Sequence, residues 1–157
     1  MEEPVFAPLT EADARQIAGW HYPPPYDEYD MPDWETVVRQ NWGIADPARR
    51  AAEFTGLYTA GQLIGYYRLQ PLSESTALLG LGLRPDCCGQ GLGTRLLPGV
   101  FCHIRACGWQ RLELEVRRQN QRALRCYARC GFTVQGEPYR RSVLGTDCWM
   151  IRMARAL

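Results

Sequence analysis

Three glycines that alternate along a short loop are the residues best suited to chemistry in this sequence. Gly89, Gly91 and Gly93 follow an apolar segment typical of a strand and precede a segment with helical apolar spacing. Such a loop exposes successive backbone N–H groups at the positive end of a helix, which suits a pyrophosphate. The chain contains no lysine, so the loop is not a Walker loop. A purely structural turn is the alternative.

A second pattern lies about thirty residues further along the chain. Asn120, Ala123, Tyr127, Gly131 and Phe132 fall on a segment that predicts a helix ending at the glycine. The spacing places Asn120 and Tyr127 near one edge of this helix. Taken by itself, Tyr127 could be a buried structural aromatic on this helix face.

Together the two patterns resemble the GNAT superfamily of acetyl-CoA-dependent N-acetyltransferases. Leu83, Pro85 and the three glycines match the motif V-x-P-x-x-R/Q-G-x-G-x-G, and the later motif N-x-x-A-x-x-x-Y-x-x-x-G-F is matched at every defined position. The resemblance covers residues 54–153 well, and the first fifty residues only in element order. Cys88 departs from the family because it stands where Arg or Gln is usual. One side-chain contact to the coenzyme is therefore in doubt, although backbone N–H groups would still hold the phosphates.

The resemblance implies acetyl-CoA as co-substrate and no metal. It implies that the pantetheine arm lies between two splayed strands and pairs with the backbone of Leu81 and Leu83. Family members use the residue matching Tyr127 as general acid toward the coenzyme thiolate, and the residue matching Asn120 contacts the arm. The expected coenzyme-binding residues are Leu81, Leu83, Cys88, Gly89, Gln90, Gly91, Gly93, Thr94, Asn120 and Tyr127.

A general base is the least determined part of the site. Glu113 and Glu115 alternate with apolar residues and share one face of a predicted strand. Ribosomal-protein alanine N-acetyltransferases resemble this segment and keep the separation between Glu115 and Tyr127. We therefore predict Glu115 as the base, taking the amine proton directly or through one water. A solvated or salt-bridged Glu115 is the alternative, and Glu113, Asp27 and Glu28 are reserve candidates.

The segment from Trp20 to Glu35 is rich in aromatic, acidic and proline residues. Aromatic rings and carboxylates together suit a cation, so we predict that this loop binds an amine acceptor. A loop packed on the core by its aromatics is the alternative for any single residue. Arg140 and Arg141, beside Tyr139, would instead favour an acceptor bearing a carboxylate or phosphate. The expected acceptor-binding residues are Tyr22, Tyr26, Asp27 and Tyr29.

Secondary-structure signals position these residues on alternating strands and helices. Thr10 is a good N-cap, Ala60-Gly61 and 145–147 indicate hairpin turns, and Pro98 predicts a kink or an irregular first turn in its helix. The pattern predicts an α/β (α+β) fold with one mixed, mostly antiparallel sheet flanked by helices on both faces, as in the GNAT-like acyl-CoA N-acyltransferase fold. Expected strands are 5–9, 54–59, 63–69, 76–83, 112–116, 132–144 and 148–153, and expected helices begin at Glu11 and cover 33–42, 92–108 and 120–130.

Length and composition limit the possible functions. The 157 residues suit one domain spanning 1–157, and a net charge of +1 argues against a general nucleic-acid binder. Residues 1–60 carry a net charge of −7 and residues 61–157 one of +8, which suggests two ligands of opposite sign. The seven cysteines fit no zinc pattern and are predicted to be reduced, mostly buried thiols in a cytoplasmic protein without membrane association.

The sequence therefore predicts an enzyme that transfers acetyl from acetyl-CoA to a primary amine by direct attack. We expect a small cationic amine as acceptor, with a peptide or protein N-terminal α-amine as the alternative. A non-catalytic acyl-CoA sensor is the rival class. No nucleic-acid partner is expected, and a homodimer remains open.

Overall fold

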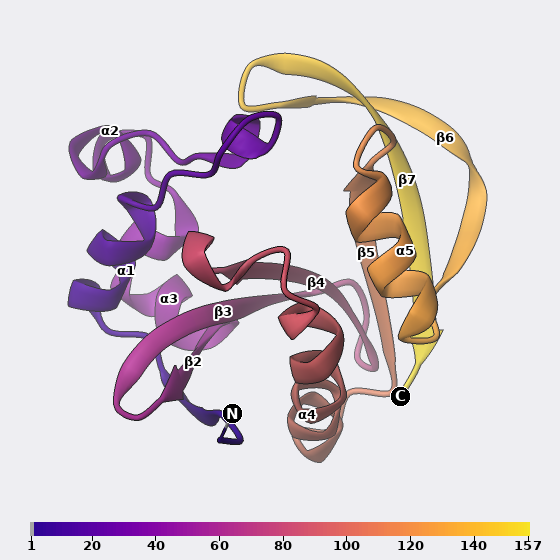
Figure 1. Cartoon of the computed structure of the whole chain (residues 1–157), viewed down its shortest axis with the longest axis horizontal. Helices are drawn as coiled ribbons and strands as arrows, with labels where there is room; N and C mark the ends of the chain where they lie inside the picture. The colour runs from indigo at the N-terminus through magenta and orange to yellow at the C-terminus, as the bar shows by residue number, and fades with distance from the viewer. Residues whose placement is uncertain (1) are drawn as a thin grey trace. The chain divides into compact units, whose positions relative to one another are not determined.

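The computed structural model describes residues 2–157 and divides them into two compact units. The first unit comprises residues 1–69 and 81–92, and the second comprises residues 70–80 and 93–157. Seven strands follow the order β1-β2-β3-β4-β5-β7-β6, in which only β4 and β5 pair in parallel among the pairings that the structure describes (Figure 1). The mixed, mostly antiparallel sheet predicted from the sequence is therefore confirmed. The prediction of a single domain stays a prediction.

The first unit begins with a strand and a helix whose start is fixed by local capping. Strand β1 (Val5–Pro8) pairs antiparallel with β2 (Phe54–Thr59), which continues through a tight turn into β3 (Gln62–Pro71). The Thr10 hydroxyl accepts a hydrogen bond from the Asp13 N–H, and the Asp13 carboxylate accepts one from the Thr10 N–H. This reciprocal capping box satisfies two backbone donors at the start of α1 (Glu11–Ala18), as predicted from Thr10.

Two more helices complete the first unit, and the sequence predicted only one of them. Helix α2 (Trp34–Arg39) is capped by Asp33 and is shorter than the predicted 33–42. Helix α3 (Pro47–Glu53) was missed, even though Asp46 caps it and Pro47 occupies its first turn. Helix α2 contributes Val37 to a buried cluster, and Ile44 and Phe54 of the same cluster lie just before and just after α3. The other members of the cluster are Leu9, Ala14, Ile17, Trp20 and Leu63.

The second unit contains the two helices that carry the predicted motifs. Helix α4 (Leu92–Ala106) continues as one α-helix through Pro98, so the predicted kink or irregular turn does not interrupt it. Because proline has no N–H, the carbonyl of Thr94 loses its usual partner four residues on. Helix α5 (Gln121–Arg129) is capped by the Asn120 side chain and ends before Gly131, whose φ of +89° favours glycine.

Strand β5 (Arg111–Arg117) of the second unit alternates between buried and less buried residues, as the sequence predicted. Its apolar residues are buried and its two glutamates lie on the other face. Strand β7 (Thr146–Ala156) pairs antiparallel with β5 and with β6 (Thr133–Val143). The parallel register between β5 and β4 (Thr76–Leu83) runs from Thr76↔Arg111 to Leu78↔Glu113. That register stops before Leu81 and Leu83.

The cysteines are less buried than we predicted. Cys148 is buried, whereas Cys102 and Cys107 are exposed near the end of α4 and the other four are half-buried. The prediction of mostly buried thiols is therefore wrong for these two cysteines. Cys102 lies outside the apolar face of α4 formed by Leu97, Val100 and Ile104, and Cys107 follows the end of the helix. All seven are free thiols.

Burial and hydrogen bonding oppose one another at Asp13. Burial favours the neutral acid, but hydrogen bonds from Tyr58 and Thr10 outweigh it and hold the pKa of Asp13 below its ordinary value of 3.8. The Tyr58 hydroxyl donates to Asp13 Oδ2 at 2.5 Å. A carboxyl group whose pKa is lowered by folding stabilises the protein at pH values above its ordinary pKa. This contribution is lost as the pH falls through the pKa of the folded state.

We expect Tyr58→Phe to lower the free energy of unfolding by about 1 kcal/mol at neutral pH, because a hydrogen bond to a half-exposed carboxylate is lost. The difference from the parent should shrink below about pH 4 as Asp13 gains a proton. Urea denaturation at several pH values measures both effects, with Asp13→Asn as the variant that lacks this titration. An equal difference at pH 7 and at low pH would contradict the assignment.

Candidate active site

The glycine loop has the backbone conformation that a phosphate cradle requires. Gly89 and Gly91 have φ values of +74° and +71°, in the region that favours glycine, and both are exposed. A Cβ added at Gly91 would meet no atom within 4 Å, so the backbone there faces open space. Alternating left-handed residues turn successive N–H groups toward one side of a loop. The loop leads directly into α4 at Leu92.

Side chains of the same loop hold its first half in place. Residues Pro85–Cys87 form a single 3₁₀ turn, and Arg84 Nε lies 2.6 Å from Asp86 Oδ1. The hydrogen bond from Arg84 holds the pKa of Asp86 below its usual range. The Gln90 amide donates to the carbonyl of Asp86 at 2.8 Å, so its side chain folds back on the loop. These contacts leave the backbone of Gly89 and Gly91 as the part of the loop suited to an anion.

The end of β4 is bonded to the predicted acceptor loop within the first unit. The Tyr22 hydroxyl donates to the Leu83 carbonyl at 2.8 Å. Burial, followed by the charges of Tyr66, Cys88 and Asp30, raises the pKa of Tyr22 well above its ordinary value of 10, so this hydroxyl remains a donor. The Cys88 thiol lies 3.8 Å from the same carbonyl oxygen. Tyr22, Leu83 and Cys88 are thus brought together.

Asp30 organises the acceptor loop, a role that the sequence did not reveal. Its Oδ1 accepts a hydrogen bond from the Tyr22 N–H at 2.9 Å, and its Oδ2 lies 3.0 Å from His21 Nδ1. In the sequence, Asp30 is only one acid among several that could attract a cation. In the structure its carboxylate binds groups of the loop itself, because the backbone N–H of Tyr22 needs a hydrogen-bond acceptor there.

The other predicted acceptor residues lie on a short 3₁₀ turn. This turn, Tyr26–Tyr29, lies within the proline-rich segment, where the prolines disfavour a longer regular element. Asp27 is exposed, and the two tyrosines are half-buried. Trp20 differs from the loop aromatics because its side chain is buried in the core cluster.

Tyr66 is a neighbour of the site that sequence reasoning missed. A Cβ added at Gly82 would lie 2.4 Å from the Tyr66 ring, so the ring packs directly on the backbone between Leu81 and Leu83. Burial raises the pKa of Tyr66 to about 12. The glycine at position 82 was the available signal, since a glycine inside a strand often marks a close approach.

In the second unit, the helical motif packs on aromatic and sulfur atoms. The Tyr127 and Phe132 rings meet edge to face with centroids 5.7 Å apart. Thr94 Oγ1, in the first turn of α4, lies 3.5 Å from the thiol of Cys126, the residue before Tyr127. Asn120 caps α5 through its side-chain oxygen. Thr94 and the helix that carries Tyr127 are therefore in contact.

Glu115 is neither solvated nor isolated. Its side chain is 12% exposed, the Tyr139 hydroxyl donates to it, and Arg141 Nε lies 3.4 Å from its Oε2. Burial and then the hydrogen bond and charge of Glu115 raise the pKa of Tyr139 to about 12. Tyr139 therefore stays a neutral donor, and Arg141 forms an ion pair with Glu115.

Glu113 has a different environment on the same strand. Its carboxylate lies 3.7 Å from Arg111 Nε and 3.5 Å from Arg152 Nη1, and it is 25% exposed. Two arginines thus hold this carboxylate in an ion-pair network.

A family model described as "Acetyltransferase (GNAT) family" matches residues 12–132. This span contains both motifs and the segment that connects them.

Two curated relatives share about half of this chain. The mycothiol acetyltransferase of Propionibacterium freudenreichii subsp. shermanii is 34% identical over 79 residues, which are 48% of this chain and 25% of that protein. The 5-NmdU N-acetyltransferase of Pseudomonas phage PaMx11 is 35% identical over 79 residues, 49% of this chain and 54% of that protein. The chain thus matches a quarter of the length of one relative and about half of the other.

A solved structure supports the fold. The spermidine N-acetyltransferase of Vibrio cholerae, solved in complex with CoA and spermine, has a TM-score of 0.76 and 19% identity. The match covers 98% of this chain and 95% of that one. At this identity the likeness shows the fold alone.

The role of Asp30 can be tested through the mobility of the acceptor loop. Asp30→Ala removes the acceptor of the Tyr22 N–H and the partner of His21, so amide hydrogen exchange across residues 21–31 should become about tenfold faster. Asp27→Ala is the matched control, because Asp27 is exposed and should leave exchange unchanged. Equal exchange in the two variants would show that Asp30 does not hold the loop.

Proposed function

Since the chain belongs to the GNAT family of acetyltransferases, we propose that it transfers acetyl from acetyl-CoA to a primary amine by direct attack. The observation that carries this proposal is the glycine loop, whose positive φ values recur at Gly89 and Gly91 inside the matched span. We further propose that the acceptor is a small cationic amine.

The residues of the loop fit the coenzyme's pyrophosphate. Gly91 has open space where a side chain would stand, and α4 begins at the next residue. The backbone N–H groups of Gly89–Thr94 would hold the phosphates, with Cys88 making no charged contact. Leu81 and Leu83 would pair with the pantetheine amides, since the register of β4 with β5 stops at Leu78. Acetyl-CoA supplies an activated acyl group when bound.

Tyr127 is the proposed general acid. Its ring is fixed by the edge-to-face contact with Phe132, and α5 is capped at Asn120, so the phenol is carried by a well-defined helix. A neutral phenol can give its proton to a leaving thiolate. Asn120 would contact the pantetheine arm, as the residue at this position of the motif does in the family.

Glu115 is the proposed base, with Tyr139 and Arg141 as positioning residues. Both neighbours orient the carboxylate, and a carboxylate can accept the proton of an amine directly or through one water. Asp27 and Glu28 remain the reserve candidates.

Charge and aromatic content support a cationic acceptor. Tyr22, Tyr26, Asp27 and Tyr29 belong to a segment without a basic residue other than His21, and Asp27 is exposed. Asp27 is exposed and lies between Tyr26 and Tyr29 on the same 3₁₀ turn, so we propose that its carboxylate, beside these rings, meets the ammonium.

Two other functions remain as alternatives. The separation of Glu115 from Tyr127 favours an N-terminal α-amine of a peptide or protein. The absence of a charged residue at position 88 favours a non-catalytic domain that binds acyl-CoA as a ligand. Release of free CoA in the presence of an amine distinguishes an enzyme from such a sensor.

Tyr127→Phe should lower kcat by about 10² to 10⁴, since general acid catalysis is lost while the ring contact with Phe132 is retained. Acetyl-CoA affinity, measured by calorimetry, should stay within about twofold. Tyr58→Phe removes a hydroxyl elsewhere and is the control for a general loss of stability. Full turnover in Tyr127→Phe would mean that solvent protonates the leaving group.

An acceptor screen that measures CoA release tests the choice of substrate. Polyamines, aminoglycosides and other small cationic amines should react faster than neutral amino acids or peptides. Asp27→Asn should raise KM for the best cationic amine about fivefold by removing one exposed charge contact, whereas Glu74→Gln should not. A preference for acidic acceptors would refute the charge argument and make Arg140 and Arg141 the better guide.

A further inference from the structure

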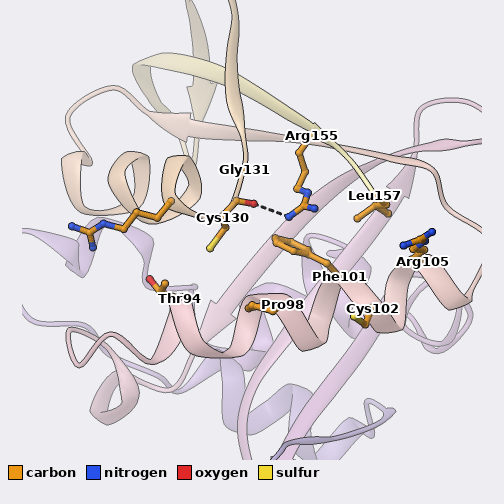
Figure 2. A pocket seen from close by; sticks show the side chains of 10 residues that line it. Thr94, Pro98, Phe101, Cys102, Arg105, Cys130, Gly131, Arg155 and Leu157 are labelled. Carbon is orange, nitrogen blue, oxygen red and sulfur yellow. Dashed lines mark hydrogen bonds between the residues drawn. The ribbon is translucent and has the colours of Figure 1, made fainter.

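A pocket of about 580 Å³ lies wholly within the second unit, along one side of α4 (Figure 2). It begins at Thr94 and continues to Arg105, a span of roughly 16 Å along a helix. The end of α5, from Arg129 to Gly131, and the end of β7 close its other side. Apart from Thr94, none of the residues predicted to bind coenzyme or acceptor contributes to its lining.

The pocket has an apolar interior. Pro98 and Phe101 project from α4, and Leu157 approaches from the end of the described chain (Figure 2). The Phe101 ring packs against Phe132 with centroids 5.7 Å apart, so this wall is continuous with the buried core. Apolar walls around a space of this size accommodate a small organic molecule.

Three arginines give the same pocket a positive charge. The Arg155 guanidinium lies over the Phe101 ring at 4.6 Å and donates to the carbonyl of Cys130 at 2.7 Å (Figure 2). These contacts fix its position. Arg105 and Arg129 are exposed at the margin and form no ion pair with any described residue. None of the lining residues that the structure describes is acidic.

We infer that this pocket binds a small organic anion with an apolar body, an aryl or alkyl carboxylate, at a site separate from that of the coenzyme. The apolar body would lie against Pro98, Phe101 and Leu157. The carboxylate would meet the guanidinium groups, whose geometry suits a carboxylate bidentately. Acetyl-CoA is not the expected occupant because the pocket runs from Thr94 toward the C-terminal end of α4, away from the glycine loop.

Calorimetry with 4-phenylbutyrate and 4-phenylbutan-1-ol tests the inference. The two probes share a carbon skeleton and differ in charge, so the carboxylate should bind at least about tenfold more tightly. Binding is measured in the absence and in the presence of saturating CoA. Equal affinity for acid and alcohol would overturn the inference, and so would complete loss of binding with CoA, because the pocket would then belong to the coenzyme site.

Charge-reversal variants locate the binding. Arg105→Glu combined with Arg129→Glu should weaken 4-phenylbutyrate binding about tenfold or more. Arg95→Glu is the matched control, since Arg95 is an exposed residue of α4 that does not line the pocket. Equal loss in the control and the double variant would indicate a general charge effect and overturn the site.

Thiol labelling gives a readout independent of both charge and activity. Cys102 lines the pocket, while Cys107 is also exposed but does not. Burial raises the pKa of the Cys130 thiol, so iodoacetamide should react first at the two exposed cysteines. Saturating 4-phenylbutyrate should slow alkylation of Cys102 at least threefold and leave Cys107 unchanged. Unprotected Cys102 would contradict binding in this pocket.

Discussion

The hydrogen bond from the Tyr22 hydroxyl to the Leu83 carbonyl is the contact on which the first unit's part of the site depends. It joins the acceptor loop to the end of β4, immediately before the turn that leads to the glycines. A shift of the loop would therefore disturb the strand end, and Asp30 restrains both by holding the Tyr22 N–H. Burial keeps Tyr22 protonated, so this link does not titrate near neutral pH.

Electrostatics separates the two glutamates of β5, although they share one face of the strand. Glu113 lies between two arginines, at 3.7 Å and 3.5 Å, whereas Glu115 has the Tyr139 phenol and one guanidinium at 3.4 Å. The phenol donates a hydrogen bond without adding a full positive charge. Glu115 is therefore oriented by a directional hydrogen bond and one ion pair, and Glu113 by two ion pairs.

The comparisons place the chain in a family whose members act on varied acceptors. Its relatives are named for mycothiol and for a modified nucleoside, and a structural neighbour is named for spermidine. A shared fold therefore does not identify the acceptor, because specificity resides in the loops that differ between members. In this chain we propose the proline-rich and acidic segment before α2 as the loop that determines the acceptor. The predictions of a cytoplasmic location, a single domain and a base at Glu115 stay predictions.

No helix among residues 2–157 is both long enough and apolar enough to cross a membrane.

The structure contains a glycine loop, a helical motif, an organised loop before α2 and a cationic pocket in the second unit. The last of these lay outside the sequence prediction. Its arginines are far apart in the chain and are close together only because α4, α5 and β7 are packed together in the second unit.

The sequence by itself determined what depends on residues a few positions apart. The Thr10 cap, the Asn120 cap, the β2–β3 turn and the glycine at the end of α5 were all predictable, because the partners are neighbours in the chain. Helix α3 had the same local signals at Asp46 and Pro47, and we overlooked them.

Only the tertiary structure decided which distant groups meet. Tyr22 and Leu83 are 61 positions apart, and Tyr139 is 24 positions from Glu115, so no spacing rule could pair them. The exposure of Cys102 and the burial of Trp20 likewise depend on which face of each segment the core covers. Local hydrogen bonds are fixed by short-range geometry, whereas these contacts form only after chain folding has brought the remote segments together.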